Sequence, residues 1–284
     1  MRSALVFGGS GQIGVPVIGR LLAHGWQVHA VSRTAHEDRD RLGWLLGGLH
    51  QVEGLPARVD AIFSLGPLDL FSSWYAGTRL HASRVVAFGS TSLDTKQESA
   101  DAHERGLADR LRDAEARVFA TANERQAKAT VLRPTLVYGA GRDRTLTRIA
   151  TLARRSGFFV LPRTANGLRQ PVHVDDLADA ALAVVDAGAT TGRSYALPGG
   201  ETLGYAQMVE RTLASLQPPV RLIRVPVPLF KAALAGAKRF GRLQGLGSAA
   251  VARMGEDLVF DVEPARRDFG YAPRAFNPAA EMFP

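Results

Sequence analysis

Short apolar runs alternate with amphipathic stretches along the first two thirds of the chain. Ala4 to Gly8 is apolar and predicts a strand, and Gln12 to Ala23 carries apolar residues at helical spacing. The pair His24-Gly25 predicts the end of that helix, and Gln27 to Ser32 predicts a second strand. A strand, a glycine turn, a helix and a strand in this order are typical of a βαβ unit, so we expect a parallel sheet.

The alternation continues beyond this unit. Further strands are expected over Ala61 to Leu65, Arg84 to Gly89, Thr130 to Leu132 with a continuation to Tyr138, and Ser194 to Leu197. Helices are expected over Ser99 to Gln126 and Asp175 to Ala187. This pattern predicts an α/β protein with a doubly wound parallel sheet, a Rossmann fold.

The regular alternation of strands and helices ends after Gly199, and several prolines follow. We expect a helix over Leu203 to Leu216, a strand over Val220 to Val225 between prolines, and a basic helix with an apolar face over Leu229 to Phe240. These elements predict a smaller C-terminal lobe that covers the substrate. The predicted boundaries are 1–138 and 169–199 for the dinucleotide-binding domain, and 139–168 and 200–284 for the lobe.

Glycines 8, 11 and 14 stand between the first strand and the first helix. In such a turn the first glycine allows the tight backbone path and the second lets a pyrophosphate approach the main chain. The third lets the helix pack closely on the strand, and the helix N-terminus attracts the phosphate. We therefore predict a dinucleotide site formed by Gly8, Ser10, Gly11, Gln12, Ile13 and Gly14. A glycine-rich turn without a ligand is the alternative.

The end of the second strand decides which dinucleotide is favoured. A carboxylate there would hold the ribose 2′-hydroxyl of NAD, but the chain continues Ser32-Arg33-Thr34 and its first acid is Glu37. The planar guanidinium of Arg33 can pair with a 2′-phosphate, and Ser32 can add a hydrogen bond. NADP is therefore the predicted cofactor and NAD the second choice, although Arg33 could also be an ordinary exposed charge.

Composition narrows the class of protein. The chain has no cysteine, which excludes disulfides and thiolate chemistry, and its histidines show no paired metal-ligand spacing, so we predict no metal site. Lys and Arg number 35 against 27 Asp and Glu, giving a net charge of +8. This excess favours a small anionic ligand first, a solvated basic surface second and nucleic acid last, because the basic residues are scattered.

The apolar run at the N-terminus is too short for a signal-peptide core or a transmembrane helix, so a cytoplasmic protein without a transmembrane segment is expected.

Several motifs in order resemble the extended or atypical branch of the short-chain dehydrogenase/reductase superfamily, the NAD-dependent epimerase/dehydratase group. They are the glycine turn, the second strand from His24 to Arg33, and the segments 131–139 (VLRPTLVYG), 169–178 (RQPVHVDDLA), 195–200 (YALPGG) and 268–273 (DFGYAP).

The resemblance implies roles for further residues. Leu65 and Gly66 would flank the adenosine ribose and the pyrophosphate. The segment from Pro134 to Leu136 would line the nicotinamide. Ser90 falls where the family has its active-site Ser or Thr, and Arg169 matches an arginine that contacts substrate phosphates in members acting on nucleotide sugars. His173 to Asp176 is more simply explained as the start of a helix than as a catalytic site.

The chain departs from the family at the catalytic dyad. Family enzymes carry Tyr-x-x-x-Lys on the helix after the fifth strand, but this chain places Leu107 and Leu111 there. Neither leucine can move a proton. Replacement donors by position are Ser90, Ser92, Lys96 and His103, and each has an ordinary structural explanation as a turn, cap or loop residue.

Three functions remain open on these grounds. The first is an NADP-dependent oxidoreductase or epimerase/dehydratase-like enzyme that acts on a small polar or phosphorylated substrate without the usual dyad. The second is a non-catalytic NADP-binding protein with a structural, sensing or complex-accessory role and a protein partner, similar to an accessory subunit of respiratory complex I. The third is a peripheral membrane role for the basic helix, which carries Lys231, Lys238, Arg239 and Arg242. The oligomeric state is not indicated.

Overall fold

The computed structural model describes residues 1–99, 101–143, 145–239 and 251–283. It divides into two compact units. The first unit contains Met1–Thr135, Val174–Leu197 and Asp261–Pro273, and the second contains Leu136–His173, Pro198–Phe260 and Arg274–Pro284.

These boundaries differ in detail from the predicted ones. The strand expected to run on to Tyr138 ends instead at Pro134, because proline has no N–H to continue the ladder. Residues Val137–Tyr138 form a separate strand, β8, which pairs with β11 (Val172–His173) inside the second unit. The late segment Asp261–Pro273 was assigned to the lobe, but it belongs to the first unit.

A mostly parallel sheet forms the centre of the first unit, in the order β12-β7-β6-β5-β1-β2-β3-β4. This confirms the predicted doubly wound α/β fold. Only β4 is antiparallel to its neighbour β3. The strands are β1 (Ser3–Phe7), β2 (Gln27–Ser32), β3 (Leu42–Gly48), β4 (Gln51–Val52), β5 (Arg58–Ser64), β6 (His81–Phe88), β7 (Lys128–Pro134) and β12 (Arg193–Leu197).

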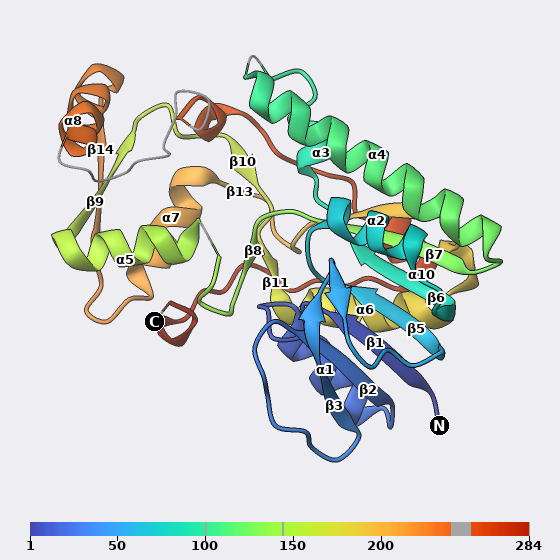
Figure 1. Ribbon diagram of the computed structural model, residues 1–284. Helices are drawn as coiled ribbons and strands as arrows, with labels where there is room; N and C mark the ends of the chain where they lie inside the picture. Colours follow the sequence, from blue (N-terminus) through green and yellow to red (C-terminus); the bar gives the residue numbers. More distant parts are fainter. Residues whose placement is uncertain (100, 144, 240–250, 284) are drawn as a thin grey trace. The chain divides into compact units, whose positions relative to one another are not determined.

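Helices cover both faces of this sheet (Figure 1). Helix α1 packs against α6 on one face, and α2 packs against α4 on the other. Layers on both sides explain why the inner strands are apolar on both faces, as in β1, where Ala4 to Phe7 are all buried. The helices of this unit are α1 (Gly14–Ala23), α2 (Leu68–Gly77), α3 (Ser92–Thr95), α4 (Ala102–Glu124), α6 (Val174–Asp186) and α10 (Glu263–Phe269).

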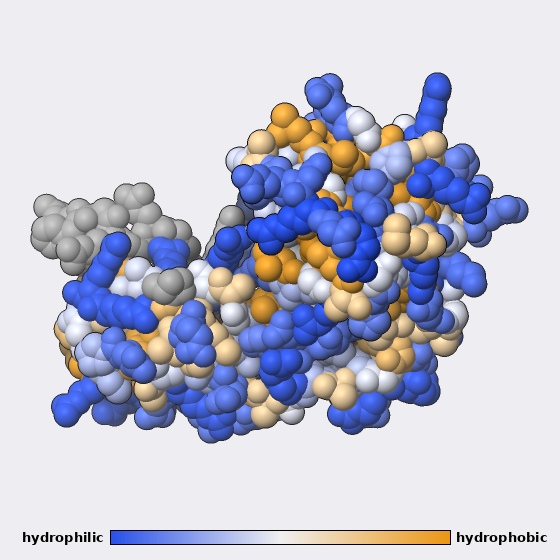
Figure 2. Space-filling view, turned by 90° about the horizontal axis from the view of Figure 1, so that it is seen from below, coloured by the Kyte–Doolittle hydropathy of each residue, from blue (hydrophilic) through white to orange (hydrophobic). Residues whose placement is uncertain are grey.

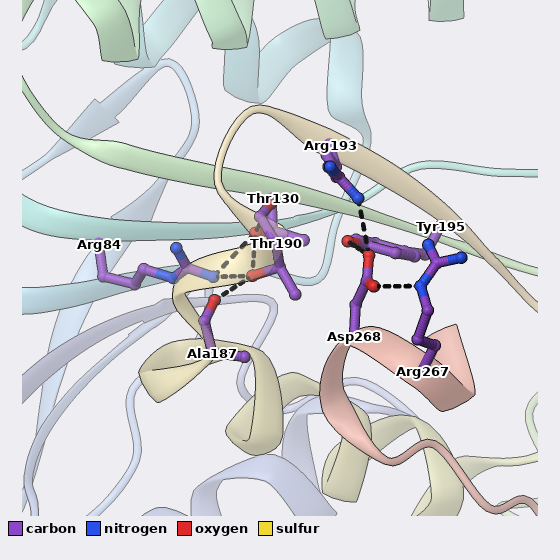
Figure 3. Close-up of polar contacts among 8 residues, drawn as sticks. All are labelled: Arg84, Thr130, Ala187, Thr190, Arg193, Tyr195, Arg267 and Asp268. Carbon is purple, nitrogen blue, oxygen red and sulfur yellow. Dashed lines mark hydrogen bonds and ion pairs between the residues drawn. The ribbon is translucent and has the colours of Figure 1, made fainter. Parts of the chain in front are cut away.

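One positive charge is buried among the strands of the first unit. Arg84 on β6 is 4% exposed, and its guanidinium donates to the Thr130 hydroxyl at 2.9 Å and to the Thr190 hydroxyl (Figure 3). It also donates to the carbonyl of Val184. Burial lowers the pKa of this arginine. The hydroxyls and the carbonyl all accept from one terminal nitrogen, and the buried Nε has no hydrogen-bond partner among the described residues. Through these bonds Arg84 ties β6, β7 and the end of α6 together.

A second polar cluster fixes α10 to β12. The Asp268 carboxylate, with 7% of its side chain exposed, accepts hydrogen bonds from Arg267 Nε at 2.9 Å, from the Tyr195 hydroxyl at 2.7 Å and from Arg193 Nη1 at 2.9 Å (Figure 3). These bonds, that of Arg267 foremost, lower the pKa of Asp268 to about 2. The late DFGYAP motif therefore has a structural role in the first unit.

This cluster predicts a pH-dependent stability. The Asp268 pKa in the unfolded chain is about 3.9, so the folded value is depressed and the carboxylate stabilises the fold above about pH 4. That contribution is lost as the pH falls from about 4 towards 2. We expect Asp268→Asn to lower the free energy of unfolding at pH 7, with the difference from the natural chain shrinking as the pH falls from about 4 to about 2. Urea unfolding at a series of pH values measures this, and a difference that stays constant would contradict it.

The second unit has its own apolar core. Leu146 and Ala150 on one helix meet Met208 and Val209 on another, and Phe276 and other residues complete the cluster. The elements of this unit are α5 (Leu146–Ser156), α7 (Tyr205–Ala214), α8 (Val227–Arg239), β8, β9 (Phe158–Pro162), β10 (Leu168–Arg169), β11, β13 (Leu203–Gly204) and β14 (Arg221–Val225). Strand β14 pairs in parallel with β9.

The basic helix predicted over Leu229 to Phe240 appears as α8, which begins at Val227. Phe240 and Arg242 lie outside the described residues. Leu229 is exposed at 61%, whereas Phe230 is buried. On the face shown in Figure 2, hydrophilic residues are spread among smaller apolar patches, which agrees with the scattered charges of the sequence. No helix in the described ranges has the length and apolar character needed to cross a membrane.

Candidate dinucleotide site and its surroundings

The glycine turn joins β1 to α1 through a close approach of backbone to backbone. Gly11 N–H donates to the Gly8 carbonyl at 2.9 Å, and Gly8 has a φ of +76°. A Cβ on Gly14 would lie 2.1 Å from the Gly8 carbonyl oxygen and 2.5 Å from that of Gly9. Only glycine fits at position 14, because the start of the helix rests directly on the turn.

The start of α1 is open to an anion. Its N-cap residue, Ile13, makes no side-chain capping bond, and no acidic residue stands in the first turn. Val15 N–H donates to the Gly11 carbonyl at 3.2 Å, Val17 N–H donates to that of Ile13 at 3.1 Å, and Pro16 has no N–H. An anion here would therefore bind at Gly14 and the turn before it, at the positive end of the helix dipole. Because the glycines of the turn have no side chains, a ligand can approach the backbone closely, and the turn fits the pyrophosphate of a dinucleotide.

The end of β5, where Leu65 and Gly66 follow the strand, lies beside this turn. Leu65 N–H donates to the carbonyl of Phe7 at 3.0 Å, and a Cβ on Gly8 would come within 3.2 Å of the Leu65 backbone. A Cβ on Gly66 would be 3.9 Å from Leu49 in the turn between β3 and β4. The adjacent carboxyl ends of β1 and β5 therefore form one edge of the candidate site.

The segment after β2 carries a cluster of polar side chains. Ser32 is 6% exposed, and its Oγ accepts a hydrogen bond from Thr34 N–H at 3.2 Å. The Thr34 hydroxyl and His36 Nε2 lie 3.2 and 3.0 Å from the same Ser32 Oγ. Arg33 is exposed, and its Cγ would be 3.7 Å from a Cβ on Gly48 at the end of β3. This polar cluster includes His36, which the sequence did not single out.

Ser90 and Pro134 belong to one loop cluster at the ends of β6 and β7. Gly89 N–H donates to the Leu132 carbonyl at 2.8 Å, and the Thr91 hydroxyl donates to the Pro134 carbonyl at 3.2 Å. Ser90 Oγ accepts from Ser92 N–H at 3.1 Å. Because that bond uses a lone pair of the oxygen, the Ser90 hydroxyl proton stays available for another acceptor.

Helix α4 presents the positions of the missing dyad. Leu107 and Leu111 are half-buried, and Leu111 packs against the core beneath the helix. Glu104 lies one turn before Leu107, so the two share a face of the helix. Glu104 Oε1 is 3.8 Å from Lys96 Nζ, and their side chains are 10% and 21% exposed. An acid and an ammonium group are therefore placed next to the dyad positions.

Further along α4, Glu115 forms an ion pair with Arg133 that anchors the helix. Arg133 on β7 donates to Glu115 through Nε at 2.8 Å and through Nη2 at 2.5 Å, and the Ser194 hydroxyl donates to Glu115 at 2.9 Å. Glu115 is 5% exposed. This network ties α4 to β7 and β12.

Two predicted residues lie in the second unit. The Leu136 carbonyl accepts from Val172 N–H at 2.8 Å. Arg169 is 6% exposed, and its Nη1 donates to the carbonyls of Leu168 at 2.7 Å and Glu256 at 2.6 Å, while Nη2 donates to that of Arg253. Burial lowers the pKa of Arg169. Three of the five N–H donors of this guanidinium are therefore engaged by backbone carbonyls of the second unit.

His173 is packed as expected of a structural residue. Its ring lies edge-on to that of Tyr138 at 5.1 Å, and a Cβ on Gly139 would be 2.3 Å from its Nε2. His173 is 6% exposed. The imidazole therefore fills the space above Gly139.

Comparison with known proteins gives three consistent similarities. A sequence model described as the NAD dependent epimerase/dehydratase family matches residues 112–197. The 2-alkyl-3-oxoalkanoate reductase of Stenotrophomonas maltophilia (strain K279a) is 27% identical, and the match covers 95% of this chain and 94% of that protein. A mitochondrial NADH dehydrogenase [ubiquinone] 1 alpha subcomplex subunit 9 from Arabidopsis thaliana is 29% identical over 37% of this chain and 26% of its own length.

Among solved structures, the UDP-glucuronic acid 4-epimerase of Bacillus cereus, in complex with UDP-glucuronic acid and NAD, superposes with a TM-score of 0.69. The two sequences are 10% identical, and the superposition covers 96% of this chain and 95% of the other. At that identity the likeness concerns the fold.

Proposed function

We propose that this chain, which is similar to the extended short-chain dehydrogenase/reductase family in sequence and to its structures in fold, is an NADP-dependent oxidoreductase that reduces the carbonyl group of a small anionic substrate. The proposal rests on the residues that follow the carboxyl ends of β1 and β2, beside the glycine turn. An uncapped helix start faces the pyrophosphate position, and β2 is followed by Ser32 and Arg33 in place of a carboxylate.

The cofactor preference rests on charge. A carboxylate after β2 would accept from the 2′-hydroxyl of NAD and repel the 2′-phosphate of NADP. Here the buried Ser32 offers a hydroxyl, and the exposed Arg33 offers a guanidinium that can bind two phosphate oxygens. The net charge of +8 also attracts an anionic cofactor. These features favour NADP, with NAD as the second choice.

The substrate class rests on the reductase relative. That protein is named for the reduction of a 3-oxoalkanoate, a compound with a ketone and a carboxylate, and it matches this chain over nearly the whole length of both. A basic protein suits an anionic substrate of this kind. We therefore favour carbonyl reduction over the epimerisation of a nucleotide sugar.

Bound NADPH would supply hydride to the carbonyl carbon. The carbonyl oxygen must gain a proton as the new C–H bond forms, and the chain has leucines where the family has its proton donor. We assign the donor to Lys96, whose Nζ is held by Glu104 on the face of α4 that carries Leu107. The ammonium group loses one proton to the oxygen and regains it from water, while the Ser90 hydroxyl donates a hydrogen bond that orients the same oxygen.

An assay of NADPH oxidation with short 3-oxo acids tests this function. We expect turnover by the natural chain and a fall in kcat of about two to four orders of magnitude in Lys96→Met, because general acid catalysis contributes about that much. The dissociation constant of NADPH should stay the same in this variant, since Lys96 is not part of the proposed cofactor site. Lys128→Met, an exposed lysine at the start of β7, is the matched control and should retain full activity. No oxidation by the natural chain with any 3-oxo acid would contradict the proposal.

One observation favours a second candidate, a non-catalytic NADP-binding protein. Leu107 and Leu111 bring apolar side chains to the dyad positions, and a subunit of a respiratory complex is among the relatives. The same assay separates the two functions, because a binder of this kind would hold NADPH tightly without oxidising it in the presence of any substrate.

A further inference from the structure

The connection between β2 and β3 leaves a gap in one helical layer. Residues 33–41 join these two parallel strands without any helix, whereas parallel neighbours are usually linked by one. The face of β3 that such a helix would cover carries Trp44, which pairs in register with Ala30 of β2. The tryptophan ring therefore needs another partner.

His36 provides that partner. Its ring stacks on Trp44 with the centroids 4.2 Å apart and the planes inclined by 29°. On its other side Trp44 reaches the glycine turn, because a Cβ on Gly9 would lie 3.6 Å from its ring. The Trp44 ring thus lies close to both the imidazole and the glycine turn, although His36 itself is exposed.

The polar edge of the imidazole faces two hydroxyls. His36 Nε2 lies 3.0 Å from Ser32 Oγ and 3.3 Å from Thr34 Oγ1. These three groups are within hydrogen-bond distance of one another, and the guanidinium of Arg33 belongs to the same short segment. Hydroxyls, an imidazole and an arginine gathered in one place are suited to the several oxygens of a phosphate monoester.

We propose that His36 is a specificity-determining residue that binds the 2′-phosphate of NADP together with Ser32 and Arg33. This inference rests on the proposed NADP preference. Trp44 acts as a positioning residue, because it fixes the plane of the imidazole without touching the phosphate. A histidine stacked only to cover β3 would affect both nicotinamide cofactors alike, whereas a phosphate ligand affects one of them.

The test is calorimetric titration of the full chain with NADPH and with NADH. His36→Phe keeps an aromatic ring for Trp44 and removes both ring nitrogens. We expect its NADPH affinity to fall about tenfold or more, as for a lost hydrogen bond to a charged group, and its NADH affinity to stay within about twofold. The NADPH affinity of His36→Gln, which keeps a nitrogen donor, should fall less. The loss of NADPH affinity in Arg33→Ala shows how much the removal of a full charge costs.

The possible failures are distinct from one another. A natural chain that binds NADH as tightly as NADPH would overturn the proposed cofactor preference, whatever His36 does. A natural chain that prefers NADPH, with the same ratio of affinities in His36→Phe, would overturn the role of His36 alone. An equal loss of both affinities with a lower melting temperature would show that the stack is only structural, and would overturn it too.

Discussion

Gly14→Ala is expected to abolish high-affinity binding of NADP(H). The new methyl group would lie 2.1 Å from the Gly8 carbonyl oxygen and 2.5 Å from that of Gly9, far inside van der Waals contact. Both oxygens are backbone atoms of the glycine turn, so relief of this overlap requires the turn and the helix start to move apart. Overpacking of this kind typically costs about 1–3 kcal/mol of stability, and the displaced N–H groups no longer converge on one phosphate. We expect the affinity for NADPH to fall at least about a hundredfold, since each 1.4 kcal/mol is about tenfold.

A matched control stands on the same helix. Gly19 is exposed, and a Cβ there would meet nothing within 4 Å. Gly19→Ala should leave NADPH affinity unchanged and stabilise the protein by up to about 1 kcal/mol, because alanine is the better helix former. Calorimetry and thermal unfolding of the two variants measure both effects. Tight binding by Gly14→Ala would show that the turn does not hold the pyrophosphate.

Arg133→Met is expected to lower the free energy of unfolding by about 3–5 kcal/mol. The variant would leave the Glu115 carboxylate buried, with the Ser194 hydroxyl as a remaining partner. Removal of one member of a buried ion pair is costly because the other charge stays out of water without compensation. The double variant Arg133→Met/Glu115→Leu should recover much of the loss, since it removes both charges. Urea unfolding measures each free energy.

An exposed ion pair serves as the comparison for this effect. Arg266 and Glu263 are 2.6 Å apart on α10, and more than half of each side chain is exposed. Arg266→Met should therefore cost no more than about 0.5 kcal/mol. The network would not be anchoring α4 if Arg133→Met lowered the free energy of unfolding as little as Arg266→Met does. The same would follow if the double variant were no more stable than Arg133→Met alone.

Local pattern was sufficient for the elements next to the glycine turn. Strand β2 spans Gln27–Ser32 as predicted, and α1 ends at Ala23 as predicted from His24-Gly25. In these segments apolar spacing, a glycine stop and the parallel arrangement all point to the same structure. The turn itself could be recognised because its glycines avoid clashes between residues that are close together in the sequence, such as Gly14 and Gly8.

Strand β3 was missed because its sequence does not look like a strand. Leu42–Gly48 reads LGWLLGG, with three glycines and no alternation, and glycine weakens strand propensity. Its conformation is set by pairing with β2, which no local window contains. His36 was overlooked for the same reason, since its importance depends on Trp44 and Ser32 meeting in space.

The split after Pro134 and the contacts of Arg169 were also beyond local reasoning. The run from Thr130 to Tyr138 is continuous in sequence, but its two halves pair with β12 and β11 in different units. Arg169 was predicted from resemblance, and its bonds to the carbonyls of Glu256 and Arg253 join residues more than eighty positions apart. Such long-range bonds leave no signature in the segment that contains the arginine.

The helix-free connection between β2 and β3 also shields the margin of the sheet. Arg39 exchanges backbone hydrogen bonds with Leu42 at 2.9 and 3.0 Å, and the Asp38 carboxylate accepts from Trp44 N–H at 2.7 Å. Further along, β4 pairs with Gly47 and Gly48. Backbone groups of β3 that would otherwise invite a strand from another molecule are thus already engaged by its own chain, which guards this rim against edge-to-edge aggregation.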